Sequence, residues 1–378
     1  MNNKIAILTQ PIGKNYGGMI QNYALQYILK EKGFKVETLA RDKKNSSLRK
    51  VLSIIKNKTY NLALNKQVRK FSDEELNYIL DSNFKFLNEH INISKNLFST
   101  QDLKKYFEQN KFSHVIIGSD QTWRPMYSPD IYNYFLDFLV DNPQVNKLAY
   151  ASSFGTDKWE YSSKDAEICK KLIKQFNNIS VREDSGVDLC KRYLDADAKL
   201  VLDPTLLLDK EVYINLFQHE NTTKSGLYNY VLDKNEIKQG FIKKISQHLN
   251  IEVFNCQPKA DMYGKLNDYS LDDYKFPTIQ SWLKGFHDAD FVVTDSFHGT
   301  VFSIIFNKPF LAITNVERGA SRFTSLLKLF NLEHRLVTDI NNFDFNLLNK
   351  AIDYKKVNEI KERLKQESLD FLLTSLKK

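Results

Sequence analysis

Short apolar runs and helical repeats alternate along the chain. Residues 4–8 read KIAIL, an apolar run of strand length. Residues 19–33 then repeat apolar side chains with the spacing of one helix face, at Ile20, Tyr23, Ala24, Tyr27 and Ile28. Gly33 is a typical helix end, and residues 34–39 are again strand-like. This strand–helix–strand opening predicts a parallel sheet with a right-handed crossover.

The alternation continues and then starts again. In the first run, strands are predicted at residues 114–119, 147–154, 178–181 and 198–203, with a helix over about 163–177 and another after residue 181. In the second run, strands are predicted at residues 227–233, 251–257, 290–295 and 309–314, with helices at 236–250, 279–289 and 299–308. Residues 354–376 follow as a long polar helix with an apolar stripe.

Two such runs predict an α/β fold with two Rossmann-like domains that face each other across a cleft. We place the first domain at residues 1–208, the second at residues 225–345 and the closing helix at residues 354–376. The length of 378 residues agrees with two domains of about 150 to 200 residues each. Ligands of such folds bind beyond the carboxyl ends of the strands, so the loops at those ends are the candidate site.

Composition narrows the class of protein. Hydrophobic residues make up 42% of the chain and charged residues 26%, which is typical of a globular enzyme. No apolar run reaches the roughly 20 residues that span a bilayer, and the amino terminus lacks the apolar region of a signal peptide, so we expect a cytoplasmic protein. Cys169, Cys190 and Cys256 lack zinc-site spacing, which predicts reduced thiols and no metal site.

The net charge of +8 is partly local. Residues 41–70 contain ten Lys or Arg side chains and a single acid, Asp42. Apolar and basic residues interleave within this segment, as in a helix that lies on an anionic membrane surface, and a contact with the inner face of the cytoplasmic membrane is one interpretation. A solvated surface helix or a connecting segment is the other. The chain has no recognisable nucleic-acid-binding motif, so we expect no nucleic-acid partner.

Two loops of the first domain carry candidate binding residues. The glycine-containing loop QPIGKNYGGMIQN precedes a helix whose free N–H groups suit an anion or a hydroxyl, although such loops are often only tight connections. In GSDQTWRP, Asp120, Gln121 and Trp123 suit a sugar, with hydroxyls on the polar groups and an apolar face on the indole. The alternative is that Asp120 caps a helix and that Trp123 packs inward.

Cations and one histidine follow other strands. Arg182 ends a strand, where it can bind a carboxylate or phosphate or make an ion pair with a neighbouring acid. His298 follows the strand DFVVT, and Arg318 and Arg322 follow the strand PFLAIT. If these two strands are neighbours, the histidine lies beside two guanidinium groups, which fits a proton donor next to a bound dianion.

Six motifs in order together resemble the polysaccharide pyruvyl transferase family. They are NYGGMIQNYALQYIL, IIGSDQTW, SVREDSG, VLDPTLLL, TDSFHGTVFSIIFNKPF and RGASRFTSLL. The resemblance runs from about residue 4 to about residue 337. It implies a glycosyltransferase-B-like pair of domains, with the carboxyl-terminal helix crossing back to the first. It also implies transfer of the enolpyruvyl group of phosphoenolpyruvate to two hydroxyls of a glycan or lipid-linked sugar in bacterial surface polysaccharide (exopolysaccharide) biosynthesis.

The resemblance further implies a donor site built from Arg182 of the first domain and His298 of the second, with Arg318 or Arg322 as the second-domain base. Phosphoenolpyruvate, the donor, is expected at Arg182, Arg318, Arg322, Ser296 and Gly299 of the sequence. The acceptor is expected on the first domain, at Asn15, Gly17, Gly18, Gln21, Asp120, Gln121 and Trp123. Some family members have a lysine in the last loop, where this chain has only arginines. No cofactor or metal is expected, because phosphoenolpyruvate is itself the donor.

Ketal formation requires a proton on the methylene carbon of the donor, and we predict His298 as that acid. Asp120 or Asp295 is a candidate base, although for Asp295 we favour a structural role, orienting His298 or capping the next helix. Two other functions stay open: a nucleotide-sugar-dependent glycosyltransferase of the same architecture, and a non-enzymatic protein that binds membrane surfaces through residues 41–70.

Overall fold

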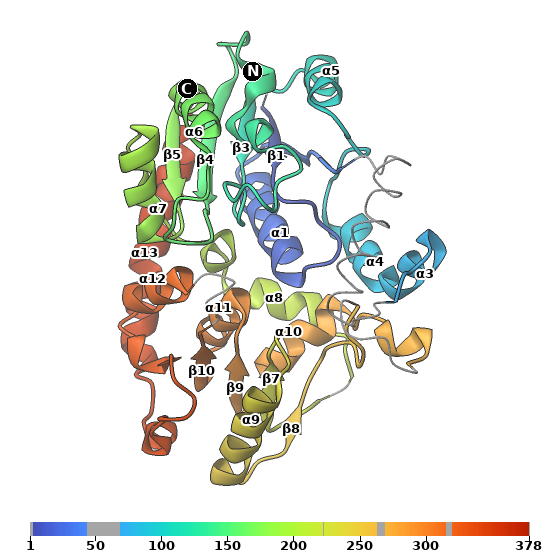
Figure 1. Cartoon of the computed structure of the whole chain (residues 1–378), viewed down its shortest axis with the longest axis vertical. Coiled ribbons are helices and arrows are strands. Elements are labelled where there is room, and N and C mark those ends of the chain that lie inside the picture. Colours follow the sequence, from blue (N-terminus) through green and yellow to red (C-terminus); the bar gives the residue numbers. More distant parts are fainter. Residues whose placement is uncertain (1–2, 44–68, 222, 263–268, 315–319, 378) are drawn as a thin grey trace.

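The computed structural model describes residues 3–43, 69–221, 223–262, 269–314 and 320–377. Two parallel sheets lie one above the other (Figure 1). The first has the order β2-β1-β3-β4-β5-β6 and the second the order β11-β10-β9-β7-β8. The strands are β1 (Lys4–Leu8), β2 (Lys35–Thr38), β3 (His114–Ile117), β4 (Asn146–Ser152), β5 (Asn178–Val181), β6 (Lys199–Leu200), β7 (Leu227–Tyr230), β8 (Val253–Phe254), β9 (Phe291–Thr294), β10 (Phe310–Ile313) and β11 (Leu336–Val337).

Helices follow most of the strands, which confirms the predicted alternation. The described α-helices are α1 (Tyr16–Glu31), α3 (Asp73–Ile79), α4 (Asp81–His90), α5 (Thr100–Asn110), α6 (Ser163–Leu172), α7 (Asp184–Leu189), α8 (Lys210–Phe217), α9 (Glu236–Leu249), α10 (Ile279–Asp288), α11 (Phe297–Ile305), α12 (Ser321–Leu329) and α13 (Tyr354–Ser375). Two predicted strands are much shorter than expected: β6 and β8 each have two residues. Both lie at a sheet edge, where only one neighbouring strand holds the backbone.

Side chains that alternate along the strands enter different cores. Tyr228 and Tyr230 of β7 pack with α10 and α11, whereas Leu227 packs on the opposite face with α9. In the first sheet, Ile5 and Ile7 of β1 face α1 in the same way. One core cluster contains residues of both sheets, because α1 also packs on the second domain. Each sheet is therefore covered on both faces, which is the reason its strands read as short apolar runs.

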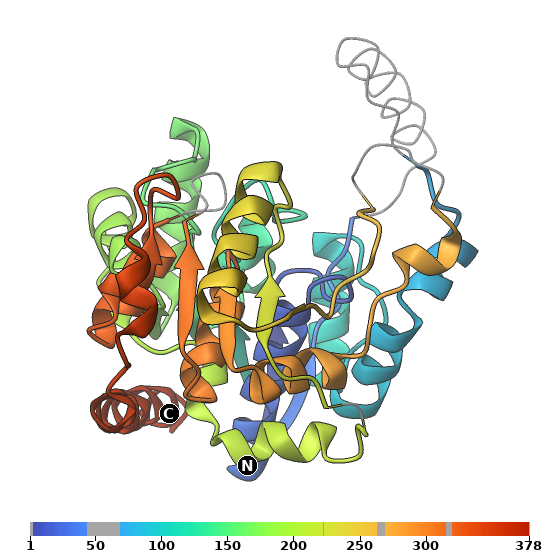
Figure 2. The ribbon, with the colours of Figure 1, turned by 90° about the horizontal axis from the view of Figure 1, so that it is seen from below.

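The last helix joins the two halves. Near its start, the Tyr354 hydroxyl donates to the backbone carbonyl of Lys308 in the second half. Further along, Ser368 Oγ accepts from the backbone N–H of Leu202 at 3.0 Å, and Asn146 Nδ2 donates to the Ser375 carbonyl at 2.7 Å. Figure 2 views α13 nearly along its axis, beside the second sheet. The helix thus crosses back to the first half, as the fold prediction required.

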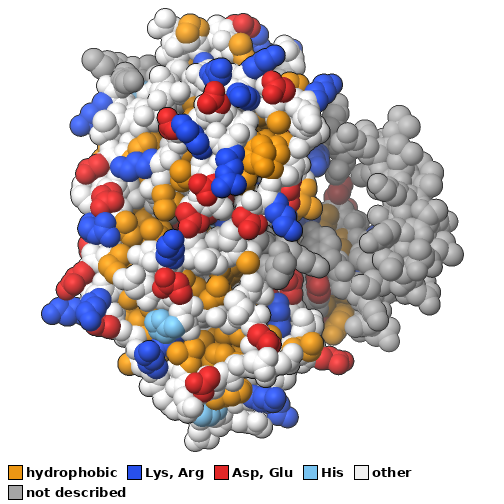
Figure 3. Space-filling model, turned by 60° about the vertical axis from the view of Figure 1, so that its left-hand side comes forward, with side chains coloured by type: hydrophobic (Ala, Val, Ile, Leu, Met, Phe, Trp, Pro, Cys, Tyr) orange, Lys and Arg blue, Asp and Glu red, His pale blue; other side chains and the backbone are white. Residues whose placement is uncertain are grey.

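The distribution of basic side chains on the described surface does not indicate a binding partner. On the face shown in Figure 3, Lys and Arg side chains are interspersed with Asp and Glu, so the positive charge is not gathered into one patch there. Most of the basic segment 41–70 lies outside the described residues. Among the described residues, no helix combines the length and the apolar character that a membrane crossing needs.

Candidate active site

Loops from both sheets enclose a pocket of about 500 Å³. Predicted binding residues supply half of its lining: Asn15, Gly18, Asp120, Gln121, Ser296, His298 and Arg322. The other lining residues are Gln10, Pro11, Ile12, Tyr127, Leu232, Asp295 and Phe297. The volume lies in the range of small-molecule sites, and the position between two domains is a common one for such sites. Most of the predicted loops therefore do meet at one place.

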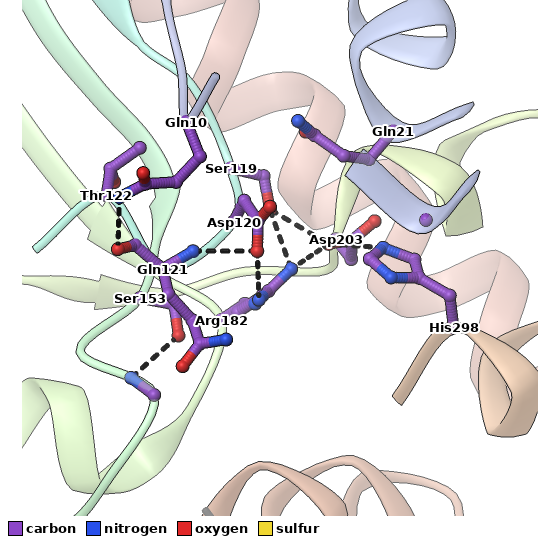
Figure 4. A network of polar contacts seen from close by, with 12 residues as sticks. Gln10, Gln21, Ser119, Asp120, Gln121, Thr122, Ser153, Arg182, Asp203 and His298 are labelled. Atoms are coloured by element: carbon purple, nitrogen blue, oxygen red, sulfur yellow. Dashed lines mark hydrogen bonds and ion pairs between the residues drawn. The ribbon is translucent and has the colours of Figure 1, made fainter. Parts of the chain in front are cut away.

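His298 lies in the first turn of α11 and not in the turn before it, because the helix begins at Phe297, two residues earlier than the predicted start at Gly299. Ser296 is the N-cap of this helix, and its hydroxyl accepts weakly from the backbone N–H of Gly299 at 3.4 Å. The His298 side chain is 8% exposed, and its Nε2 lies 3.8 Å from Oδ2 of Asp203 in the first domain (Figure 4). This separation is too long for a hydrogen bond but close enough for attraction between charges. The histidine of one half thus faces a carboxylate of the other.

Asp203 is the centre of the polar network in Figure 4. Its Oδ2 accepts from Ser119 Oγ at 2.8 Å and from Arg182 Nη1 at 2.7 Å, and its Oδ1 accepts from the Thr205 hydroxyl at 2.7 Å. Burial raises the pKa of this carboxyl, but His298 and Arg182 more than offset that effect and hold its pKa well below the usual range. Asp203 is therefore a fixed negative charge behind His298.

Arg182 makes ion pairs, which is one of the two roles left open by the sequence. Its side chain is 1% exposed; besides Asp203, it pairs with Asp120 Oδ1 at 3.5 Å. The Phe297 ring lies against it, with 4.6 Å between the guanidinium carbon and the ring centroid. Burial disfavours the cation, but Asp203 and Asp120 raise its pKa above the usual value. Arg182 is not among the residues that line the pocket.

Of the two arginines predicted after the strand PFLAIT, Arg322 is among the described residues, and it lines the pocket. It lies in the first turn of α12, and its guanidinium carbon is 5.8 Å from the centroid of the Phe297 ring. Burial and the nearby charge of Arg182 lower the pKa of Arg322 to about 10. This is the signature of a cation whose charge is disfavoured by its surroundings. The other predicted arginine, Arg318, lies outside the described residues.

The first glycine loop supports His298 directly. Asn15 caps α1, with its Oδ1 accepting from the backbone N–H of Gly17 at 3.0 Å. A Cβ atom on Gly17 would lie 2.1 Å from Nδ1 of His298, so only a glycine lets the helix and the ring approach this closely. A Cβ on Gly18 would lie 3.3 Å from Oδ2 of Asp120. Gly17 therefore makes room for a catalytic candidate and is not itself part of the pocket lining.

The GSDQTW loop divides between the pocket and the core. Asp120 has φ 80°, a left-handed conformation, and its Oδ1 accepts from the backbone N–H of Gln121 at 2.8 Å. Both residues line the pocket. Trp123 is fully buried, its ring stacks on Phe135 with centroids 5.3 Å apart, and its Nε1 donates to the Tyr134 carbonyl. The prediction that Trp123 stacks on a sugar is therefore wrong, because neither face of its ring is available.

Three other predicted residues serve the scaffold in this structure. Gln21 is 1% exposed and donates to the Thr9 hydroxyl, so it does not reach the pocket. A Cβ on Gly299 would lie 2.2 Å from Oγ1 of Thr294, which makes this glycine a packing residue. Asp295 accepts from Lys238 Nζ at 2.7 Å and from the backbone N–H of Leu232 at 2.6 Å. Asp295 is thus structural, as favoured, but it neither orients His298 nor caps α11.

Sequence reasoning missed the partner of His298 and one aromatic residue of the pocket. Asp203 stands in the quoted motif VLDPTLLL at the end of a predicted strand, and nothing in the sequence indicates the histidine across the domain interface. Tyr127 follows the GSDQTW loop, and no sequence pattern distinguishes it from a buried aromatic residue. In both cases the missing information is which loops meet in space.

Comparisons with known proteins agree with this architecture. In solved structures, the fold is similar to UGT89C1 from Arabidopsis thaliana complexed with UDP-L-rhamnose, with a TM-score of 0.53, 8% identity, and coverage of 100% of this chain and 99% of that chain. It is also similar to MnaA from S. aureus in a co-structure with UDP, with a TM-score of 0.50, 10% identity, and coverage of 98% and 97%. At such low identity these likenesses concern the fold alone.

A search of curated proteins finds no significant match to the chain. The sequence model of one family does match, namely that described as polysaccharide pyruvyl transferase, over residues 15–317. The matched segment contains the first glycine loop from Asn15 onward, the GSDQTW loop, Arg182, Asp203 and His298. Because this match covers most of the chain, the protein belongs to the polysaccharide pyruvyl transferase family.

Proposed function

We propose that the protein transfers the enolpyruvyl group of phosphoenolpyruvate to two hydroxyls of a glycan or lipid-linked sugar, forming a pyruvate ketal and releasing phosphate. One observation carries the proposal: His298 and Arg322 line the same pocket, with the buried Asp203 carboxylate directly behind the histidine. Such a pocket offers a proton donor and a cation to one small anionic substrate. Family membership supports a transferase that modifies polysaccharides.

Arg322 is the first cation that we assign to the donor. Phosphoenolpyruvate carries a carboxylate and a phosphate, and a bound anion would compensate the disfavoured charge of this buried guanidinium. Arg318, four residues earlier in the sequence, is proposed as the second. Arg182 is proposed not to bind the donor directly, because its guanidinium already makes ion pairs with Asp203 and Asp120. It keeps both carboxylates in place beside the donor.

His298 is proposed to donate a proton to the methylene carbon of phosphoenolpyruvate. The proton converts the methylene into a methyl group and leaves an oxocarbenium-like carbon, which the first sugar hydroxyl attacks. The C–O bond to phosphate then breaks, and the second hydroxyl attacks the same carbon to close the ketal. Of the two hydroxyl protons, one replaces the proton that His298 gave to the methyl group, and the other leaves with the phosphate. The Asp203 carboxylate, 3.8 Å from Nε2 of His298, provides a fixed negative charge behind the imidazole.

Asp120 is proposed as the base for a sugar hydroxyl. It lines the pocket, whereas the carboxylate of Asp295 is engaged by Lys238 and by backbone N–H groups. The ion pair of its Oδ1 with Arg182 Nη2, at 3.5 Å, holds the carboxylate at the pocket wall.

Thermal unfolding with added ligands provides the first test. Phosphoenolpyruvate should raise the unfolding temperature, and nucleotide sugars should not. The reverse result would favour the glycosyltransferase alternative and reject the proposal. Phosphate release from phosphoenolpyruvate, measured with a panel of nucleotide-linked and lipid-linked sugars, then tests turnover.

His298→Ala tests the assigned acid. We expect this variant to keep its thermal shift with phosphoenolpyruvate but to lose phosphate release by about 10²- to 10⁴-fold, the usual contribution of general acid catalysis. His287→Ala is the matched control, since His287 Nδ1 lies 2.9 Å from Asp288 Oδ1 but the residue does not line the pocket. Near-normal phosphate release by His298→Ala would reject His298 as the acid.

A further inference from the structure

The pocket has a buried inner part and an exposed rim. Arg322 and His298, which we assign to the donor, are only 7% and 6% exposed. Tyr127, on the same pocket, is 41% exposed. A compact donor held by the buried cation and the histidine would leave the tyrosine end of the pocket to the second substrate. The acceptor therefore has to approach through the part of the site that Tyr127 borders.

Tyr127 is held as a fixed surface by a buried arginine. The guanidinium carbon of Arg124 lies 5.0 Å from the centroid of the Tyr127 ring. Arg124 is itself 6% exposed, and its Nε and Nη2 each donate to a carboxylate oxygen of Glu160 at 2.9 Å. In addition, the backbone N–H of Tyr127 donates to the Arg124 carbonyl at 3.1 Å. Because the cation is anchored by two hydrogen bonds, the ring beside it has little freedom to turn away.

Polar groups that suit hydroxyls lie beside this ring. Gln121 and Gln10 line the same pocket, and Gln10 Nε2 donates to the Gln121 carbonyl at 2.7 Å. Gln121 Oε1 in turn accepts from Arg124 Nη1 at 3.3 Å, which links the amide to the support of the tyrosine. An exposed aromatic side chain next to fixed amides complements a pyranose, which has an apolar face and hydroxyl groups around its edge.

We propose that Tyr127 is the platform on which a pyranose ring of the acceptor stacks, with the ring positioned so that its hydroxyl pair points inward to Asp120 and the donor. This rests on the proposed function for the identity of the inner substrate. Tyr127 thereby takes the role that the sequence suggested for Trp123, whose ring is buried. The acceptor class is a pyranoside with one face free of axial polar groups.

Two assays with Tyr127→Ala and Tyr127→Phe test the platform. The first is saturation-transfer NMR with the methyl pyranosides of galactose, glucose and mannose, which measures sugar binding without any turnover. The second is phosphate release at varied acceptor concentrations. We expect Tyr127→Ala to lose saturation transfer and to raise the KM for the acceptor by about tenfold or more, with the KM for phosphoenolpyruvate nearly unchanged. Tyr127→Phe should keep both, because it retains the ring.

Tyr193→Ala is the matched control, since Tyr193 is 42% exposed and lies outside the pocket lining. If Tyr127→Ala binds the sugars and uses the acceptor as the wild type does, the platform is rejected while the transferase function stands. If the wild type binds a sugar through Tyr127 but releases no phosphate, the function is rejected while the platform stands. Wild-type protein that neither binds these sugars nor releases phosphate counts against both.

Discussion

Gly17→Ala provides a sharp test of whether the contact between α1 and α11 positions His298. The added Cβ would lie 2.1 Å from Nδ1, 2.7 Å from Cγ and 2.9 Å from Cε1 of the imidazole. An ordinary contact begins at about 3.4 Å, so the ring and the helix must separate by about 1.3 Å. The ring cannot easily rotate away, because His298 lies in the first turn of a buried helix.

The expected consequence falls on the rate more than on folding. A displacement of about 1 Å at a reacting group costs on the order of 10²-fold in rate, or about 2.7 kcal/mol of activation free energy. On stability, alanine gains about 1 kcal/mol over glycine inside a helix, which opposes a crowding cost of about 1–3 kcal/mol. We therefore expect phosphate release to fall about 100-fold, with a change of less than about 2 kcal/mol in the free energy of unfolding from urea titration.

Two other glycine variants make the comparison quantitative. Gly18→Ala places its Cβ 3.3 Å from Oδ2 of Asp120, a tight but tolerable contact, and should have an intermediate effect. Gly240 lies in α9, and a Cβ added there would have no atom within 4 Å, so Gly240→Ala should leave the rate of phosphate release unchanged. A Gly17→Ala protein that releases phosphate within about twofold of the wild-type rate would refute the argument that His298 must stay at this position.

Four further predictions concern charge. Asp203→Asn leaves the buried Arg182 without its nearest carboxylate and should lower the free energy of unfolding, measured by urea titration, by about 3–5 kcal/mol. The control Asp209→Asn removes an exposed ion pair and should lower it by less than about 1 kcal/mol. The pKa of Asp203 is held below its unfolded value near 4, so the stabilisation that the carboxylate provides is complete above about pH 4 and is lost on acidification. The Asn variant should therefore lose less stability than the wild type between about pH 5 and pH 3. Equal losses by the two proteins would contradict this. Arg322→Met should abolish most of the thermal stabilisation by phosphoenolpyruvate, and Lys328→Met on the same helix should not; an unchanged shift in the Arg322 variant would remove this cation from the donor site. Finally, the membrane interpretation of residues 41–70 requires the 378-residue protein to sediment with anionic phosphatidylglycerol vesicles but not with neutral ones. Under that interpretation, replacement of Arg49, Lys50, Lys56 and Lys58 by Gln weakens the binding by more than about tenfold, whereas equal binding by the variant would show that residues 41–70 are not the contact.

The strands of the core were predictable because of where they lie. A strand buried on both faces of a parallel sheet must be a short apolar run, and β1, β3, β4, β7, β9 and β10 all fit this description. The edge strands β6 and β8 were overestimated, since apolar residues continue past the point where backbone pairing stops. The helices α3, α4 and α5 lie in succession between β2 and β3, and they were not predicted because three consecutive helices break the simple alternation of strand and helix.

The candidate site was predictable only within each loop. The strand-end rule placed His298 and Arg322 at one rim of the second sheet and Asp120 at the end of a strand in the first, and the structure brings all three to one pocket. Which residues of the two domains contact each other across their interface was not predictable from the sequence. For this reason neither the contact of His298 with Asp203 nor its close approach to Gly17 was predicted. Trp123 shows the same limit, since an aromatic residue after a strand fits a pocket or a core equally well until its neighbours are known.

The crossing helix α13 imposes a rule on how this chain can change length. It contacts the second half at Tyr354 and the first half at Ser368 and Ser375, and each contact depends on the angle at which the side chain or carbonyl leaves the helix axis. Deleting one residue between Tyr354 and Ser368 would rotate everything beyond it by about 100°. The buried Leu372 would then turn toward water. Insertions and deletions in α13 should therefore be tolerated only when the number of residues added or removed is close to a whole number of helical turns. The surface loops of either domain are free of this constraint.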